Sequence, residues 1–183
     1  MANMSHISTN SPHAWILAAR PKTLTGAAVP VMIGISAAWA DGFFRPVPAL
    51  LCFLFAFLMQ IDANFINDYY DFRKGLDDEK RLGPKRACAE GWITLPAMRR
   101  GIVCTTLLSC LTGLPLVWYG GWTMVLVGVC CVVFCFLYTT CMARLGLGDL
   151  LVLVFFGLVP VGATYYLQSG TVVPEVWALS LAW

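Results

Sequence analysis

Charged side chains are scarce in this chain of 183 residues. Asp, Glu, Lys and Arg together make up 12% of it, whereas hydrophobic residues make up 59%. A soluble globular domain carries about twice that charged fraction, and a soluble α/β fold also needs helices with a polar face. The long apolar runs of this sequence have almost no polar face. The composition therefore argues against an ordinary soluble domain and indicates an integral membrane protein.

Histidine and paired cysteine motifs are also nearly absent. His6 and His13 are the two histidines, and none of the eight cysteines forms a C-x-x-C pair. These residues cannot complete a zinc site of the usual spacing. The cysteines lie mostly inside apolar runs, so we interpret them as small apolar side chains that fill space between helices.

Runs of mostly apolar residues recur at the length of a membrane-spanning helix. Such a helix needs about 20 apolar residues, with a range of about 17 to 25. We therefore predict an all-α fold, a polytopic bundle of transmembrane helices. Its first five predicted spans are 24–40, 47–66, 102–119, 122–138 and 150–167. A sixth begins near Val172 and is cut off at Trp183.

The cations are distributed unevenly between the two ends of these predicted spans. Of the twelve Lys and Arg residues, all but Arg45 fall on one side of the membrane. The positive-inside rule assigns that side to the cytoplasm. We therefore predict a multi-pass protein of the cell (inner or plasma) membrane, with a cytoplasmic N-terminus and a cytoplasmic loop at 72–101.

The second predicted span ends in polar residues that share one helix face. At 100° per residue this face contains Gln60, Asn64, Asn67, Asp68 and Asp71, whereas Asp62 lies on the opposite side. Polar groups in a membrane helix are costly and usually face a cavity or the interior of the bundle. The carboxylates also stand at the helix C-terminus, where the macrodipole is negative, so a positive partner is expected.

Two kinds of positive partner are open. Loop cations such as Arg73 and Lys74 could form surface ion pairs with the acids, each worth about 1 kcal/mol or less. The alternative is a divalent metal, because Asp68 and Asp71 lie one turn apart and Mg²⁺ binds through one or two carboxylates plus substrate phosphates. We favour the metal, since ion pairs in a loop do not explain why amides and acids share a face inside the span.

Basic residues near this polar face predict an anionic ligand. Arg20 and Lys22 flank Pro21 at the start of the first span, and Lys85 and Arg86 follow in the loop after the acids. Acids that hold a metal, ringed by such cations, suit a diphosphate. The apolar bundle beside them suits a hydrocarbon tail, which together indicates a lipid diphosphate. The alternative for Lys85 and Arg86 is a topology signal or contact with lipid headgroups.

Five blocks of the sequence, taken in order, carry a family resemblance. They are R-P-K-T-L at 20–24, N-F-I-N-D-Y-Y-D-F-R-K-G-L-D-D at 64–78, G-P-K-R-A at 83–87, G-L-G-D at 146–149 and F-F-G-L-V-P-V-G-A-T-Y-Y-L-Q at 155–168. N-D-Y-Y-D at 67–71 looks like the first aspartate-rich motif of the UbiA superfamily of membrane prenyltransferases. The set is most similar to the MenA branch, the 1,4-dihydroxy-2-naphthoate polyprenyltransferases of menaquinone biosynthesis. We therefore divide the chain into a polar N-terminal tail at 1–13 and an incomplete UbiA-like membrane domain at 14–183.

The resemblance implies a bundle of nine membrane helices around a central cavity, of which this chain would supply the first five to six. It implies Mg²⁺ as cofactor, with a polyprenyl diphosphate and an aromatic acceptor as substrates. The implied metal ligands are Asn67, Asp68, Asp71 and Asp77. The implied diphosphate contacts are Arg20, Lys22, Asn64, Lys85 and Arg86. The implied catalytic residues are Asp68, Asp71 and Tyr138, the last of which would stabilise cationic charge or orient the acceptor.

The reaction of that branch joins the prenyl chain to the acceptor ring. Metal and cations stabilise the departing diphosphate, so that the allylic C1–O bond can ionise. The electron-rich ring attacks the allylic cation, the ring carboxylate leaves as CO₂, and the product is a demethylmenaquinone. The apolar walls of the bundle protect the cation from water.

The chain departs from the family pattern in two places. A second aspartate-rich motif is absent, since Asp149 is the sole acid between Glu90 and Glu175, and Y-T-T-C-M-A-R at 138–144 lacks the Gly-Gly-Pro of the branch. We therefore expect these 183 residues alone to be catalytically incomplete, through an early stop, a fragmentary gene model or a separately encoded C-terminal half. Three other hypotheses stay open: a UbiA-type enzyme with a hydroxybenzoate or homogentisate acceptor, an inactive membrane fragment, and a transporter or channel.

Overall fold

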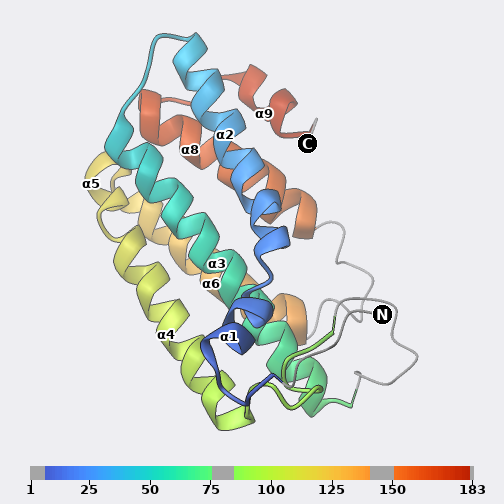
Figure 1. The fold of residues 1–183 in the computed structure, drawn as a ribbon. Helices are drawn as coiled ribbons and strands as arrows, with labels where there is room; N and C mark the ends of the chain where they lie inside the picture. Colours follow the sequence, from blue (N-terminus) through green and yellow to red (C-terminus); the bar gives the residue numbers. More distant parts are fainter. Residues whose placement is uncertain (1–6, 76–84, 141–150, 182–183) are drawn as a thin grey trace.

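The computed structural model describes residues 7–75, 85–140 and 151–181 (Figure 1). Within these residues the chain forms helices and no strand. Three helical stretches, Pro12–Ala40, Pro46–Arg73 and Leu95–Gly120, are long and apolar enough to cross a membrane. Two shorter apolar helices cover Trp122–Tyr138 and Leu153–Ser169. The predicted all-α membrane bundle is therefore confirmed.

The helices of the described residues follow one another along the chain in a simple order. They are α1 (Pro12–Ala19), the 3₁₀ turn η1 (Pro21–Thr23), α2 (Leu24–Ala40), α3 (Pro46–Arg73), α4 (Leu95–Gly113), α5 (Leu116–Gly120), α6 (Trp122–Thr140), the π-helical segment η3 (Leu153–Leu158), α8 (Val159–Ser169) and α9 (Pro174–Leu181). The bounds of α2 coincide with the predicted span 24–40. The short helix α1 was not predicted; the Ser11 hydroxyl caps it by accepting from the N–H of Ala14.

The helix α3 continues past the apolar run that ends at 66 and reaches Arg73, so the predicted helix face from Gln60 to Asp71 lies on one helix. The predicted start of α4 was wrong. The helix predicted to start at 102 begins at Leu95. Thr94 is extended, and Pro96 stands in the first turn of the helix, where a missing N–H is tolerated. The sixth predicted span is represented by the eight-residue helix α9.

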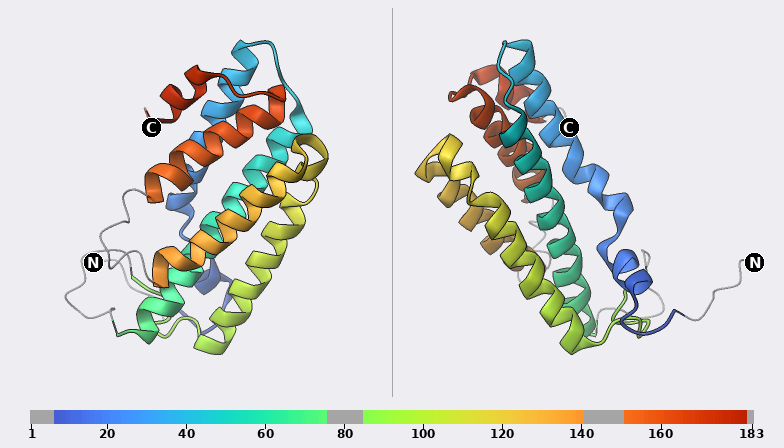
Figure 2. Two further views of the ribbon diagram at one scale, coloured as in Figure 1. Left: turned by 180° about the vertical axis from the view of Figure 1, so that it is seen from behind. Right: turned by 60° about the vertical axis from the view of Figure 1, so that its left-hand side comes forward.

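The helix α3 is the central element of the bundle. It packs against α2, α4 and α6, and Figures 1 and 2 show α2 and α4 on opposite sides of it, with α6 and α8 across one face. The end of α3, the start of α4 and the helix α1 meet at the lower end of Figure 1. Trp39, Trp118 and Trp122 are exposed on elements at the other end, as residues of a membrane–water interface are.

A buried cluster fixes α1 and the segment after residue 85 against α3 and α4. Ala14 of α1, Ile93 and Met98 are each at most 1% exposed in this cluster. The rings of Trp15 and Phe65 meet edge to face with their centroids 5.3 Å apart. This packing brings two segments that are distant in sequence onto the polar end of α3.

The helices α2 and α8 approach each other closely at Gly34. A Cβ atom at this position would lie 2.7 Å from the carbonyl oxygen of Val161 and 2.9 Å from Cβ of Thr164. Small residues allow such backbone contacts between membrane helices. The close approach closes one side of the space between α2, α3, α6 and α8.

Candidate functional site

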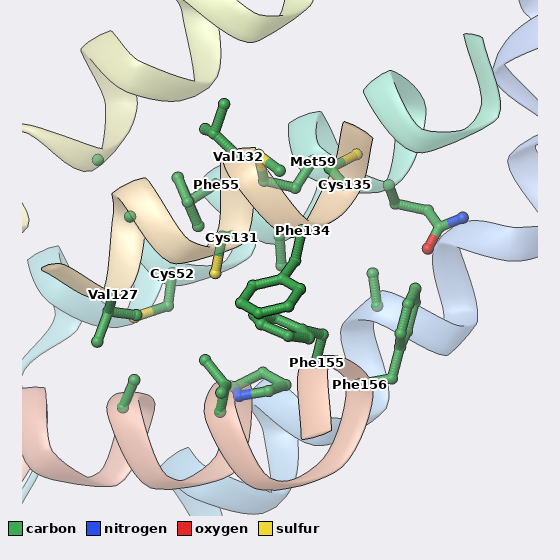
Figure 3. Close-up of a pocket in the computed structure, with 18 of the residues that line it drawn as sticks. Cys52, Phe55, Met59, Val127, Cys131, Val132, Phe134, Cys135, Phe155 and Phe156 are labelled. Atoms are coloured by element: carbon green, nitrogen blue, oxygen red, sulfur yellow. The ribbon is translucent and has the colours of Figure 1, made fainter. Parts of the chain in front are cut away.

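An apolar cavity of about 460 Å³ lies between α2, α3, α6 and the η3–α8 helix. Figure 3 shows Phe55 and Met59 of α3, Cys131 and Phe134 of α6, and Phe155 of η3 around it. The rings of Phe134 and Phe155 pack across it with their centroids 4.6 Å apart. Several cysteines line the cavity as small apolar side chains, in agreement with their interpretation from the sequence. Such a space suits a hydrocarbon chain.

Polar side chains line this cavity too, among them three that were named from the sequence. Asn67, one helical turn before Asp71, is a lining residue, and so is Tyr138 near the end of α6. Gln60, one of the polar-face residues, lines it as well. The cavity therefore reaches from apolar walls to the turn of α3 that carries the N-D-Y-Y-D motif.

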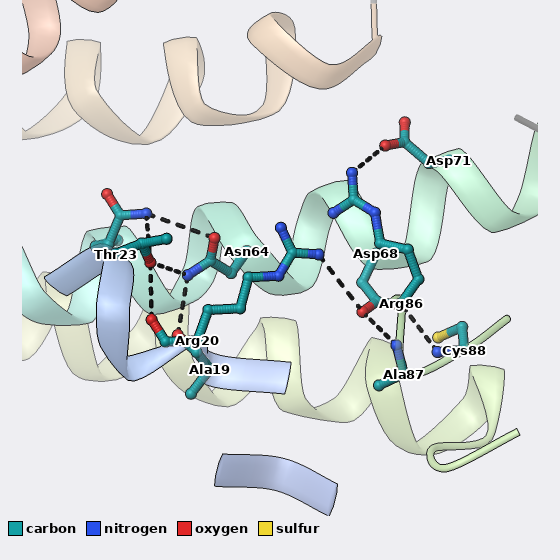
Figure 4. Close-up of polar contacts among 10 residues, drawn as sticks. Ala19, Arg20, Thr23, Asn64, Asp68, Asp71, Arg86, Ala87 and Cys88 are labelled. Atoms are coloured by element: carbon teal, nitrogen blue, oxygen red, sulfur yellow. Dashed lines mark hydrogen bonds and ion pairs between the residues drawn. The ribbon is translucent and has the colours of Figure 1, made fainter. Parts of the chain in front are cut away.

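The upper part of the polar face binds the junction between α1 and α2. The side-chain amide of Asn64 donates to the carbonyl of Ala19 and to Oγ1 of Thr23, each at 2.9 Å. The Gln60 amide donates to the same Thr23 oxygen at 3.3 Å. Asn64 is 4% exposed. The side-chain amide of Asn64, predicted to contact a diphosphate, thus binds Ala19 and Thr23 in the structure. These hydrogen bonds hold the segment that carries Arg20 against α3 (Figure 4).

The carboxylate of Asp68 binds two successive backbone N–H groups. Its Oδ2 accepts from the N–H of Ala87 and its Oδ1 from the N–H of Cys88, both at 2.8 Å. Arg20 adds a cation, with Nη2 4.0 Å from Oδ2. The Asp68 side chain has no exposed surface. Asp68 therefore orders the segment 86–88 from inside the protein (Figure 4).

Asp71 and Arg86 form the shortest ion pair of the described residues. Nη2 of Arg86 lies 2.6 Å from Oδ2 of Asp71, and the side chains are 6% and 20% exposed. Because Asp68 holds the backbone on the C-terminal side of Arg86, the guanidinium is directed toward Asp71, one turn along α3. The four charged groups Arg20, Asp68, Asp71 and Arg86, called here the charged cluster, form two acid–base pairs at one end of α3.

Arg20 reaches this cluster through an uncommon backbone conformation. Its φ angle is +52°, and its N–H caps α1 by donating to the carbonyl of Leu17. A residue with a Cβ atom rarely adopts this left-handed conformation, and Pro21 next in the chain disfavours continuation of α1 through Arg20. Strained residues of this kind persist where the surrounding contacts hold them, often at functional sites.

Two of the four cations predicted as diphosphate contacts lie outside the charged cluster. Lys22 is exposed. Lys85 pairs with Glu90 at 2.8 Å, and its side chain is 51% exposed. Asp77, predicted as a metal ligand, lies outside the described residues. The structure therefore brings together Arg20, Asn64, Asp68, Asp71 and Arg86, and it places Asn67 and Tyr138 on the cavity.

The donor set suits Mg²⁺ that arrives with a phosphate ligand better than Mg²⁺ bound by protein alone. The described residues include no group of three or more His, Cys, Asp or Glu side chains that could hold a metal. Asn67 and Asp71 offer oxygens four residues apart on one helix face. Magnesium typically takes one or two carboxylates and completes its shell with substrate phosphates and water. The residues present fit that mode of binding.

Sequence reasoning missed the main partners of both buried acids of α3. The backbone N–H groups of Ala87 and Cys88 carry no signal in side-chain chemistry. Asp62 was placed on the opposite face, and it lies there, with no exposed surface. Its two oxygens accept from the hydroxyls of Thr105 at 2.5 Å and Thr106 at 2.6 Å. Two adjacent threonines in an otherwise apolar helix were the feature of the sequence that could have predicted these hydrogen bonds to Asp62.

Curated proteins similar to this chain are prenyltransferases or prenyltransferase-domain proteins by name. The 1,4-dihydroxy-2-naphthoate octaprenyltransferase of Escherichia coli is 37% identical over 182 residues, which cover 94% of this chain and 59% of that protein. The protein of the same name from Haemophilus influenzae is 36% identical over 169 residues, covering 86% and 55%. The UbiA prenyltransferase domain-containing protein 1 of Danio rerio is 30% identical over 188 residues, covering 92% and 52%.

The chain thus spans between half and three-fifths of the length of these relatives. A family model described as the UbiA prenyltransferase family matches residues 27–183. The matched region includes α3 with its polar face and the cavity walls formed by α6 and α8. The resemblance predicted from the five sequence blocks is confirmed, and this chain belongs to the UbiA prenyltransferase family.

Proposed function

We propose that this chain binds a polyprenyl diphosphate and serves the transfer of its prenyl group to 1,4-dihydroxy-2-naphthoate. The observation that carries the proposal is that Asn67 lines the apolar cavity while Asp71, four residues further along α3, pairs with Arg86. Arg20 lies beside Asp68 on the same part of α3. The hydrocarbon tail lies in the cavity, and the diphosphate lies at the charged cluster. The names of the bacterial relatives support this acceptor over hydroxybenzoate or homogentisate.

Each polar residue then has a separate role. Asn67 and Asp71 would hold Mg²⁺, and the metal would supply charge neutralisation of the leaving group. Arg20 and Arg86 bind the diphosphate, and a phosphate gives Arg86 a new partner in place of Asp71. Asp68 positions the segment 86–88 through its backbone contacts. Lys22, Lys85 and Asp77 are outer contacts of the diphosphate in this proposal.

The proposed reaction exchanges a carboxylate for a prenyl group. The allylic C1–O bond breaks, and the diphosphate leaves with the electron pair. The ring carbon that carries the carboxylate forms a bond to C1, and the carbon–carboxylate bond then breaks, with loss of CO₂ and return of its electrons to the ring. Because no oxidant takes part, the ring leaves as the hydroquinone form, demethylmenaquinol. Tyr138, a cavity-lining residue, stabilises cationic charge or orients the acceptor.

The orientation in the membrane is part of the proposal. The cations of the charged cluster, together with Arg73, Lys74, Arg99 and Arg100, belong to the connected ends of α1, α3 and α4. Under the positive-inside rule this end faces the cytoplasm of a cell (inner or plasma) membrane. A single cysteine in place of Glu90, in a background without native cysteines, should resist an impermeant thiol reagent added outside intact cells. Labelling of this cysteine from outside the cells would contradict the proposed orientation.

Substrate binding and transfer are tested separately. The purified chain is titrated with a non-reacting polyprenyl thiodiphosphate, with Mg²⁺ or with EDTA. We expect binding that depends on Mg²⁺, and absence of binding under both conditions would overturn the proposal.

Membranes that contain the chain are next supplied with polyprenyl diphosphate, Mg²⁺ and equal amounts of dihydroxynaphthoate, hydroxybenzoate and homogentisate. We expect any product to come from dihydroxynaphthoate, and prenylated hydroxybenzoate or homogentisate would replace the proposed acceptor. Because these 183 residues contain no second aspartate-rich motif, we expect little product from them alone and more product after a polypeptide that carries such a motif is added.

A further inference from the structure

A second hollow of the bundle, called here the lateral groove, lies between α3, α4 and α6. Its volume is about 510 Å³. It is lined by Tyr69, Tyr70 and Arg73 of α3, by Arg99, Ile102, Val103, Thr106 and Leu107 of α4, and by Phe136 of α6. The lateral groove and the apolar cavity share no lining residue. It is therefore a separate site from the one proposed to bind the prenyl diphosphate.

The lateral groove is basic at one end and apolar along its length. Arg73 stands in the last turn of α3 and Arg99 in the second turn of α4. From Arg99, the apolar lining residues of α4 continue to Leu107, which is about 12 Å along a helix at 1.5 Å per residue. Val103 and Leu107 are 54% and 58% exposed. Cations therefore lie at the end of the bundle, and exposed aliphatic side chains lead from them toward its middle.

Both arginines are available to an external anion. Arg73 is exposed, and its guanidinium carbon lies 5.7 Å from the centroid of the Tyr69 ring, which holds it at the rim by a cation–π contact. Arg99 is exposed. The ion pairs found in the described parts of the chain join other residues, namely Arg20 with Asp68, Lys85 with Glu90 and Arg86 with Asp71.

We infer that the lateral groove binds an anionic phospholipid. Its phosphate contacts Arg73 and Arg99, and one acyl chain lies along Val103 and Leu107. Guanidinium groups bind phosphate through paired N–H donors, and basic pockets between membrane helices bind anionic headgroups. The order of charge and apolar surface along the groove matches that of a phospholipid, with its headgroup at the membrane surface and its chains inside. A small aromatic acid would use the cations but not the aliphatic length of the groove.

The test compares two lipids that differ in headgroup charge. The purified chain is mixed with equal amounts of phosphatidylglycerol and phosphatidylcholine of identical acyl chains, and the retained lipids are counted by native mass spectrometry. We expect preferential retention of phosphatidylglycerol. The double variant Arg73→Gln and Arg99→Gln should lose about fivefold in retention for each cation removed. The matched control Arg45→Gln removes a cation at the opposite end of the bundle and should keep the preference.

A second variant tests the groove itself and leaves its charges in place. Val103→Trp fills the apolar part, and we expect it to lower retention of phosphatidylglycerol while binding of the thiodiphosphate stays unchanged. Equal retention of both lipids by the unaltered chain would overturn the inference, as would an unchanged double variant or an equal loss in Arg45→Gln. Displacement of the lipid by dihydroxynaphthoate would also overturn it, because the lateral groove would then be an acceptor site.

Discussion

Asp62 and Asp68 are both fully buried on α3, six residues apart. They accept hydrogen bonds from different kinds of donor. Asp62 accepts from the hydroxyls of Thr105 and Thr106 on the neighbouring helix α4. Asp68 accepts from the backbone N–H groups of Ala87 and Cys88. A hydroxyl can donate or accept, whereas a backbone N–H can only donate. The first contact can therefore adapt to a change of the acid, and the second cannot.

Asp71 differs from both of these buried acids. Its side chain is 20% exposed, and it lies one helical turn from Asn67, which lines the cavity. We expect Asp71→Asn to have the largest effect on binding. Loss of the ligand charge should weaken Mg²⁺-dependent binding of the thiodiphosphate by about 100-fold or more, since even outer-shell changes at metal sites cost 10- to 100-fold. Titration at several Mg²⁺ concentrations measures it. Near-normal binding at limiting Mg²⁺ would place the metal elsewhere.

Asp68→Asn should have the next largest effect. The amide brings an NH₂ group against a backbone N–H that cannot turn away, so at least one buried donor of Ala87 or Cys88 loses its partner. An unsatisfied buried group costs about 1–3 kcal/mol, and the free energy of unfolding should fall by that amount. Thiodiphosphate binding should weaken by about 10-fold, as for an outer-shell residue. Faster proteolysis near residue 86 would accompany the change, and unchanged stability would contradict it.

The adjacent cations Arg86 and Lys85 provide a matched pair for the same question. Arg86 is 6% exposed and directed at Asp71, whereas Lys85 is half exposed and pairs with Glu90. We expect Arg86→Gln to weaken thiodiphosphate binding by about 10-fold, which is about 1.4 kcal/mol and close to the lower limit of about 1.5–3 kcal/mol for one hydrogen bond to a charged group. Lys85→Gln should change it less, because an exposed pair is worth about 1 kcal/mol or less. Equal effects of the two variants would show that the position of Arg86, which Asp68 fixes through the backbone, does not matter for binding of the thiodiphosphate.

Asp62→Asn should have the smallest effect. The hydroxyls of Thr105 and Thr106 can rotate to accept from the amide, and hydrogen bonds between membrane helices are worth about 0.6 kcal/mol on average. The unfolding free energy should change by less than about 1 kcal/mol, and thiodiphosphate binding should not change. Chemical unfolding in detergent measures the first. A loss as large as that of Asp68→Asn would remove the distinction between the two acids.

Predictability from the sequence follows the same division. The bounds of α2 and the opposite placement of Asp62 were predicted because apolar runs and helical periodicity depend on nearby residues. The start of α4 at Leu95 was not, since its first two turns contain Arg99 and Arg100 and so do not belong to an apolar run. The partners of Asp68 are backbone groups, which every residue possesses, so no side-chain pattern could indicate them. The adjacency of Asp71 and Arg86 was anticipated as a cluster of opposite charges, but the pairing required the fold.

Gly34 makes the contact between α2 and α8 intolerant of added side-chain volume. The backbones of the two helices meet there with no room for a Cβ atom, so any slide between them would disrupt a close-packed contact. On the facing helix α6, Gly128 lines the cavity, and a Cβ added there would meet nothing within 4 Å. We therefore expect that the shape of the cavity can be changed from α6 without displacing the contact between α2 and α8.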